Sequence, residues 1–296
     1  MMVASLQVIV DGLSIGSTYA LLALGLSLVF SVMGFVNFAY GSLIVWAGYA
    51  IAVTDSVGAP YALTILVMVV FTVVLSIAMG RFAFRPFITA PPATLLLTSF
   101  GVALALQAVA IFVFGEAPRH VPTPPVLIES VSVGGVRISL LQILALGLSV
   151  IVLVALNLLI QRTTFGIEIR AAAEDSKAAQ LMGVRPPKVL LVVFAISGVV
   201  AAVVAFVWFA RIGTVDPRAD LTPTLKAFIA VVLGGLGTIR GPVIGGLLLG
   251  LFESVLASFL TTDLLAFQSA FAFGLVILVL ILRPQGVAGR VVELAK

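Results

Sequence analysis

The chain has 296 residues, of which 62% are hydrophobic and only 9% are charged, and its formal net charge is +4. A soluble domain carries charge on roughly a quarter of its residues, so this composition excludes a soluble globular protein. The sequence contains no cysteine and one histidine, which excludes disulfides, thiolate chemistry and a centre of several histidines, and we expect no bound metal.

Apolar segments follow one another along the whole chain, and most are close to the roughly 20 residues that cross a hydrocarbon core. They predict an all-α polytopic membrane protein with a single transmembrane domain over residues 1–296. The segment 226–239 is too short and too rich in glycine to span alone, so we interpret it as a broken or half helix, which leaves about eight transmembrane helices. The apolar segments are 5–32, 38–54, 60–80, 93–114, 139–161, 188–210, 226–239, 241–260 and 264–282.

The first two spans meet at a polar, glycine-containing break, VNFAYGS, at residues 36–42. Such a break is tolerated only where protein or a water-filled cavity surrounds it, and in transporters it often lies beside the pathway. The candidate pathway residues here are Asn37, Phe38, Tyr40 and Gly41. For Gly16 and Gly25, close packing of helices in lipid is the simpler interpretation.

The loop 115–138 is rich in proline and leads into the motif VSVGGVRIS, which predicts a short β-hairpin. Basic residues gather in the loops near 81–85 and 162–188 and in the C-terminal tail, and the positive-inside rule places these on the cytoplasmic side. This orientation makes 115–138 an external loop and predicts an external N-terminus and a cytoplasmic C-terminus. The basic residues that then fall outside are Arg119, Arg137, Arg211, Arg218 and Lys226.

The cytoplasmic loop 162–188 is a charged, alanine-rich segment in an otherwise apolar chain. Glycines near both ends predict one helix over 166–183. Arg170, Glu174 and Lys177 would share one face of that helix, and the small alanines would leave its backbone open to close approach. The helix either packs on its own bundle or docks a cytoplasmic partner. The docking candidates are Gly166, Arg170, Ala171, Ala172, Glu174, Asp175, Lys177, Ala178, Ala179 and Gly183.

A second glycine-rich element, VLGGLGTIRGPVIGGLLLGLFES, lies at 232–254. Glu253 falls inside the following apolar run, and we expect it to face the bundle interior, either as a structural contact or as part of a pathway. Because a partner or a proton would relieve its burial, we expect Glu253→Gln to fold. The pathway candidates in this region are Gly234, Gly235, Gly237, Thr238 and Glu253.

These segments together resemble the permease subunits of the branched-chain (hydrophobic) amino acid ABC importers, over nearly the whole chain. The resemblance is carried by GLSIGSTYALLALGLSLVF, GFVNFAYGSLIVWAGYA, FGIEIRAAAEDSKAAQLMGV, VLGGLGTIRGPVIGGLLLGLFES and LRPQG. Importer permeases carry a cytoplasmic loop of the form Glu-Ala-Ala-x-x-x-Gly, which seats in a groove of the ATPase subunit. Here Lys177 stands at the glutamate position, followed by Ala178, Ala179 and Gly183, and Tyr40 stands where the family more often has histidine.

The resemblance implies the branched-chain type of ABC-importer permease fold and a subunit that translocates branched-chain or hydrophobic amino acids across the bacterial inner membrane, driven by ATP. The implied partners are a second homologous permease, two cytoplasmic ABC ATPases, a periplasmic substrate-binding protein and membrane lipid. The chain lacks a G-x-x-x-x-G-K-[ST] phosphate loop, so ATP and Mg²⁺ are expected on the ATPases. For this chain we expect no cofactor, no enzymatic activity and no nucleic-acid partner.

Two alternatives stay open. Importers of the same class carry urea, amides or aromatic carboxylates, because the binding protein largely sets the substrate. An ion-coupled secondary transporter would need a charged residue at mid-membrane, and Glu253 is the one plausible candidate for that role.

Overall fold

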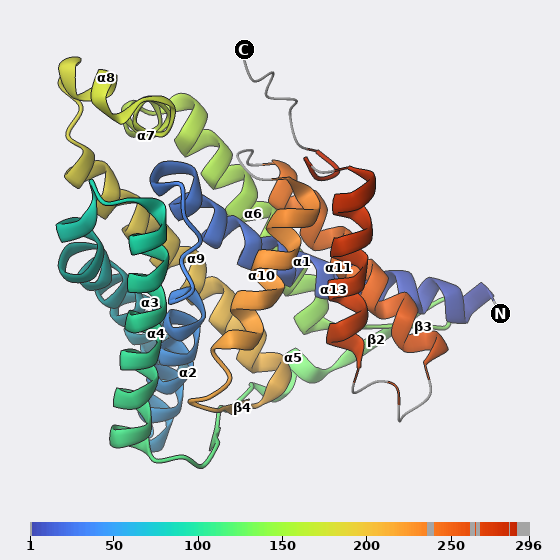
Figure 1. The fold of residues 1–296 in the computed structure, drawn as a ribbon. Helices are drawn as coiled ribbons and strands as arrows, with labels where there is room; N and C mark the ends of the chain where they lie inside the picture. Colours follow the sequence, from blue (N-terminus) through green and yellow to red (C-terminus); the bar gives the residue numbers. More distant parts are fainter. Residues whose placement is uncertain (1, 236–239, 261–263, 265–266, 284, 289–296) are drawn as a thin grey trace.

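The computed structural model describes residues 2–235, 240–260, 264, 267–283 and 285–288, and these are mostly helical (Figure 1). The helices are α1 (Met2–Met33), α2 (Tyr40–Ser56), α3 (Tyr61–Ala78), α4 (Pro92–Phe114), α5 (Pro125–Ile128), α6 (Leu140–Arg162), α7 (Thr164–Glu174), α8 (Ser176–Leu181), α9 (Pro186–Ile212), α10 (Leu221–Gly234), α11 (Arg240–Phe259) and α13 (Gln268–Leu282). Short π and 3₁₀ turns, Met79–Phe84 and Arg85–Phe87, continue α3. The prediction of an all-α polytopic membrane protein is confirmed.

Each of the eight predicted spans forms a helix, but the helices differ in length. Six described helices, α1, α3 with its following turns, α4, α6, α9 and α11, are long and apolar enough to cross a membrane. The helices α2 and α13 have 17 and 15 residues and fall short of the roughly 20 expected. The doubtful segment 226–239 agrees with a half helix, since α10 has only 14 residues, although it begins earlier, at Leu221.

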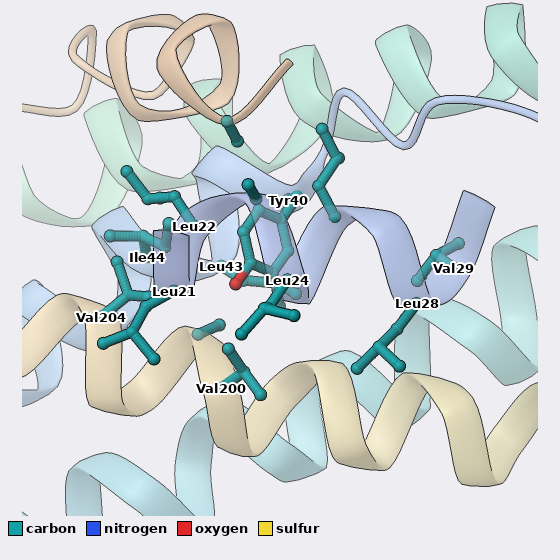
Figure 2. Close-up of a cluster of buried hydrophobic side chains, with 14 of the residues drawn as sticks. Leu21, Leu22, Leu24, Leu28, Val29, Tyr40, Leu43, Ile44, Val200 and Val204 are labelled. Carbon is teal, nitrogen blue, oxygen red and sulfur yellow. The ribbon is translucent and has the colours of Figure 1, made fainter. Parts of the chain in front are cut away.

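The helices α1 and α9 run through the middle of the bundle, whereas α4 and α6 leave most of their apolar surface uncovered. Figure 2 shows this centre, where Leu21, Leu22 and Leu24 of α1 lie among Tyr40 of α2 and Val200 of α9. In lipid, such van der Waals packing is the main attraction between helices. The uncovered faces of α4 and α6 are therefore surfaces for lipid or for another chain.

Glycines bring the backbones of α1 and α11 into direct contact. A Cβ atom added to Gly250 would overlap the backbone N and Cα of Gly16, and one added to Gly246 would overlap the backbone of Ala20. Only glycine permits such an approach, which is the small-residue packing common in membranes. The packing interpretation of Gly16 is confirmed, and its partner on α11 is identified. Gly25 likewise packs against Tyr40, whose ring would overlap a Cβ atom at that position.

Two small antiparallel sheets lie at the opposite end of the molecule from α7 and α8 (Figure 1). The strands β2 (Ser130–Val133) and β3 (Val136–Ser139) form the predicted hairpin. Its turn residues Gly134 and Gly135 have φ of +61° and +87°, as a type I′ turn requires. The strands β1 (Arg119–His120) and β4 (Thr214–Val215) join the loops that follow α4 and α9.

Candidate functional site

The charged loop 162–188 forms two helices, so the prediction of a single helix is wrong. The chain leaves α7 and enters α8 at Asp175, whose backbone is extended, with φ −148° and ψ 102°. The Asp175 carboxylate caps α8, because it accepts hydrogen bonds from the backbone N–H of Lys177 (2.8 Å) and Ala178 (3.0 Å). Lys177 therefore begins a new helix and does not share the predicted face of α7.

The cap on α8 is an ionised carboxylate. Hydrogen bonds from the backbone of Ala178 and Lys177 lower the pKa of the Asp175 carboxyl. A carboxyl with a lowered pKa stabilises the folded state above its ordinary pKa, and that contribution disappears as the pH falls through the lowered value. The cap is consequently intact throughout the neutral range.

Gly183 closes α8 with a Schellman motif. The N–H of Val184 donates to the carbonyl of Ala179 (3.0 Å), and the N–H of Gly183 donates to the carbonyl of Gln180 (3.0 Å). Gly183 has φ +91°, a left-handed conformation that side-chain-bearing residues rarely adopt. No atom lies within 4 Å of the position of an added Cβ, so the need for glycine here is conformational.

Two apolar side chains of the loop are highly exposed to solvent. Leu181 and Met182 are 90% and 86% exposed. The spacing of alanine and glycine did not point to them, although an apolar pair beside a closing glycine is visible in the sequence. Ala172 and Ala179, predicted to be accessible, are buried, whereas Ala178 of α8 is exposed.

The helix α7 is held firmly on the end of α6. The Thr163 hydroxyl accepts from the N–H of Gly166 (3.1 Å) and so caps α7. A Cβ atom at Gly166 would overlap the carbonyl of Ile160, and the Arg170 guanidinium donates to that same carbonyl. Gly166 and Arg170 therefore fix the angle between the two helices.

The break between α1 and α2 is buried in protein. Asn37 is buried, its Oδ1 accepts from the N–H of Ala39 (3.2 Å), and its Nδ2 has no hydrogen-bond partner within the described chain. The Phe38 ring stacks on Phe100, with centroids 4.2 Å apart, and the Phe38 N–H donates to the Ser99 hydroxyl (3.2 Å). The break is thus surrounded by protein, one of the two environments expected for it.

Tyr40 and Gly41 lie at tight helix contacts. The Tyr40 side chain is fully buried, and its hydroxyl has no hydrogen-bond partner among the described residues. A Cβ atom on Gly41 would overlap the carbonyl of Asp220 and the hydroxyl of Thr224, so α2 crosses the beginning of α10 closely there. The pathway role of these residues stays a prediction, and their observed contacts are packing contacts.

The end of α10 is a crowded junction. A Cβ atom on Gly234 would overlap the carbonyl of Gly241, and Gly235 ends the helix with φ +102°. The N–H groups of Val287 and Ala288 donate to the carbonyls of Leu233 and Gly234 (2.8 and 3.0 Å), so the chain after α13 binds the end of α10. The other two candidates in this region, Gly237 and Thr238, lie outside the described residues.

Glu253 faces the bundle interior, as predicted, and it is paired. It is 3% exposed, it forms an ion pair with Lys226 of α10, and it accepts a hydrogen bond from the Tyr19 hydroxyl of α1 (2.6 Å). The Lys226 ammonium also lies 5.5 Å from the centre of the Tyr19 ring. Three helices are joined at this point, and the burial of the carboxylate is compensated by an opposite charge.

The placement of Lys226 in an external loop is wrong. Lys226 is 8% exposed and lies on the buried face of α10. The sequence separates it by 27 positions from its carboxylate partner, so no local spacing identifies the pair. Lys226 therefore does not count among the loop charges, and the orientation of the chain stays a prediction.

These features define a class of protein. The chain is a multi-pass helical membrane protein with a glycine-packed bundle and an exposed pair of short helices at one end. The family model described as "Branched-chain amino acid transport system / permease component" matches residues 8–280. The chain belongs to this family of permease components.

Individual relatives support the same assignment. The chain is 33% identical to the high-affinity branched-chain amino acid transport system permease protein BraD of Pseudomonas aeruginosa, over 96% of each chain. It is 31% and 30% identical to the corresponding LivH proteins of Escherichia coli K12 and Salmonella typhimurium, again over 96% of each chain. No solved structure matches the chain significantly.

Proposed function

We propose that this chain is a translocating subunit of an ATP-driven importer of branched-chain amino acids. The observation that carries the proposal is the similarity to BraD and LivH, which extends over 96% of each chain. The family model likewise matches residues 8–280. In the proposed assembly this permease pairs with a second permease, receives substrate from a periplasmic binding protein and is driven by two ATPases. The proposed location is the bacterial inner membrane, with the N-terminus outside. The charged loop 162–188, which we propose as the coupling loop, lies inside.

The proposed seat of the ATPase is the exposed end of α8. Leu181 and Met182 offer apolar contact area, and Ala178 lets a partner approach the helix closely. Because α7 is fixed to α6 through Gly166 and Arg170, a push on α8 would reach the bundle as motion of α6. ATP and Mg²⁺ are assigned to the partner subunits.

The ion pair argues against a secondary transporter. A coupling carboxylate must bind and release an ion or a proton during transport. Glu253 is instead occupied by Lys226 and Tyr19 on separate helices, which favours a structural contact. Urea, amides and aromatic carboxylates remain the alternatives for the substrate within the importer class.

The function is tested in proteoliposomes that contain the purified permease, its co-purified subunits and the binding protein. We expect ATP-dependent uptake of radiolabelled leucine that a protonophore leaves unchanged, with urea and benzoate failing to compete. Uptake without ATP that a protonophore abolishes would contradict the proposal. Competition by urea or benzoate in place of leucine would keep the class and change the substrate.

Replacement of Gly183 is expected to uncouple the ATPase. An alanine in the left-handed conformation costs about 1–2 kcal/mol, which is enough to unwind a helix as short as α8 while the bundle stays folded. We expect Gly183→Ala to hydrolyse several times more ATP per leucine imported, measured in the same proteoliposomes. Gly58, with φ +69° in the α2–α3 loop and open space around it, is the matched control. If Gly58→Ala uncouples to the same extent, the effect of Gly183→Ala does not report on docking.

A further inference from the structure

A cavity of about 970 Å³ lies at the end of the bundle that carries the coupling loop. It is bordered by α1, α6, α7, the start of α11 and Ala288, and it is open on one side; Figure 1 shows α7 lying across the end of α6 there. Its volume is at the upper end of the range, about 300–1,000 Å³, of small-molecule sites in proteins. It is therefore large enough for a metabolite.

The cavity has an apolar floor. Leu24 and Leu28 of α1, Leu156 and Ile160 of α6, and Ile169 of α7 line it, and all five are buried. The one other buried residue of the described lining is Ser27 of α1, so the buried part of the lining is mostly branched aliphatic. A ligand that enters from the open end would place an aliphatic group there, because that group leaves water for an apolar surface.

The rim of the cavity carries both signs of charge. Arg240 begins α11 and Glu174 ends α7, and both side chains are exposed. Within the described part of the chain, neither has an ion pair or a side-chain hydrogen bond. Asn157 and Gln161 of α6 also line the cavity, and their amides add donors and acceptors.

A second cleft provides a contrast. It has about 700 Å³ beside α8, and its charged lining residues are Arg85, Arg185 and Lys188, with no acidic residue among those that line it. That lining would attract an anion and repel an ammonium group. Of these two, the cavity beneath α7 is the one that combines groups of both signs with aliphatic side chains.

We propose that the cavity between α1, α6, α7 and α11 is a binding site for a free amino acid with an aliphatic side chain. The carboxylate is bound by Arg240, the ammonium group by Glu174, and the side chain lies on the leucine and isoleucine floor. The site opens toward the end that carries the coupling loop, so it holds the transported solute on the exit side. The inference rests on the proposed function and adds to it a substrate-binding site inside the permease.

The site also touches the coupling loop. Ile169, Arg170, Ala173 and Glu174 all belong to α7, so one wall of the cavity is the helix that is fixed to α6. A bound amino acid therefore bridges α7 and α11. Its occupancy would restrain the same helix that receives the push from α8.

The test is equilibrium binding of radiolabelled leucine to the intact permease complex in nanodiscs, without binding protein or ATP. We expect saturable binding that Arg240→Gln and Glu174→Gln each weaken at least tenfold. Arg162→Gln, which removes an exposed charge of the same end outside the cavity lining, is the matched control and should bind as the wild type does.

Ligand analogues make the test independent of any variant's folding. Leucinol lacks the carboxylate and isocaproate lacks the ammonium group, and each should compete at least tenfold less well than leucine for the wild-type complex. In Arg240→Gln, leucinol should compete as well as leucine does, because the carboxylate has lost its partner. In Glu174→Gln, isocaproate should compete as well as leucine does, because the ammonium group has lost its partner. Equal competition by all three ligands would overturn the assignment of the charges.

The outcomes separate the inference from the proposed function. A complex that imports leucine but shows no saturable binding overturns this site and leaves the importer intact. The same holds if Arg240→Gln and Glu174→Gln both bind leucine as well as the wild type does. Retention of an anionic phospholipid by the wild type but not by Arg240→Gln, without leucine binding, would assign the cavity to lipid. A complex that neither imports nor binds leucine overturns both.

Discussion

Lys226→Met is expected to destabilise the protein by about 3–5 kcal/mol, the usual effect of removing one partner of a buried ion pair. Glu253 would keep the hydrogen bond from Tyr19 but lose its counter-ion inside the bundle. The loss corresponds to a fall of about 10 °C in Tm for a chain of this size. The measurement is thermal unfolding of the purified complex in detergent.

The matching double variant separates charge from packing. Lys226→Met/Glu253→Leu replaces the whole pair with apolar side chains, a change that is often neutral or stabilising. We therefore expect its Tm to recover most of the loss. If the double variant is as unstable as the single one, shape and not an unpaired charge is responsible.

An exposed pair supplies the control. Arg218 and Glu116 form an ion pair of 2.9 Å with side chains that are more than half exposed. Exposed pairs contribute about 0–1 kcal/mol, so Arg218→Met should barely change Tm. Equal effects of Arg218→Met and Lys226→Met would mean that burial does not make the Lys226–Glu253 pair more sensitive to the loss of one partner.

The interior pair also shows where sequence reasoning reaches its limit. The hydropathy pattern was sufficient to locate the eight predicted spans, because every span must satisfy its backbone internally and be apolar. Pairing within the bundle depends on which helices become neighbours, and Lys226 at the start of a short helix looks like a loop residue. The expectation that Glu253→Gln folds also changes, since that variant would leave Lys226 buried without its counter-ion.

The charged loop 162–188 was predictable in location but not in shape. Charge and alanine content identified 162–188, and its closing Gly183 was identified correctly. The division at Asp175 was missed, because an aspartate inside a helical pattern is compatible with either a surface position or an N-cap. Its capping bonds to the next helix decide between them.

Glycine spacing carried part of the packing information. The dense series in 232–254 pointed to an unusual element, and two members of the series, Gly246 and Gly250, lie against the backbone of α1. The sequence alone left open whether such glycines pack helices or border a pathway. The distinction needs the position of the facing backbone, which only the assembled bundle provides.

Gly250→Ala is therefore expected to be among the most damaging small substitutions in the chain. The new methyl group would overlap the backbone N and Cα of Gly16, and backbone atoms cannot move aside as a flexible side chain can. The helices α1 and α11 would have to separate along the contact that also holds the hydrogen bond from Tyr19 to Glu253. We expect a loss of about 3 kcal/mol, at the upper end of the range for overpacked cores, seen as a lower Tm and as aggregation in size-exclusion chromatography.

Gly147→Ala on α6 is the matched control, because no atom lies within 4 Å of its added Cβ. Alanine is favoured over glycine inside a helix by about 0.5–1 kcal/mol, so this variant should be as stable as the wild type or more so. The two substitutions add the same methyl group to helices of the same bundle, and opposite signs are expected only if α1 and α11 are in backbone contact. A Gly250→Ala variant with wild-type Tm would mean that α1 and α11 are farther apart, and the position of Glu253 relative to Tyr19 would then have to differ as well.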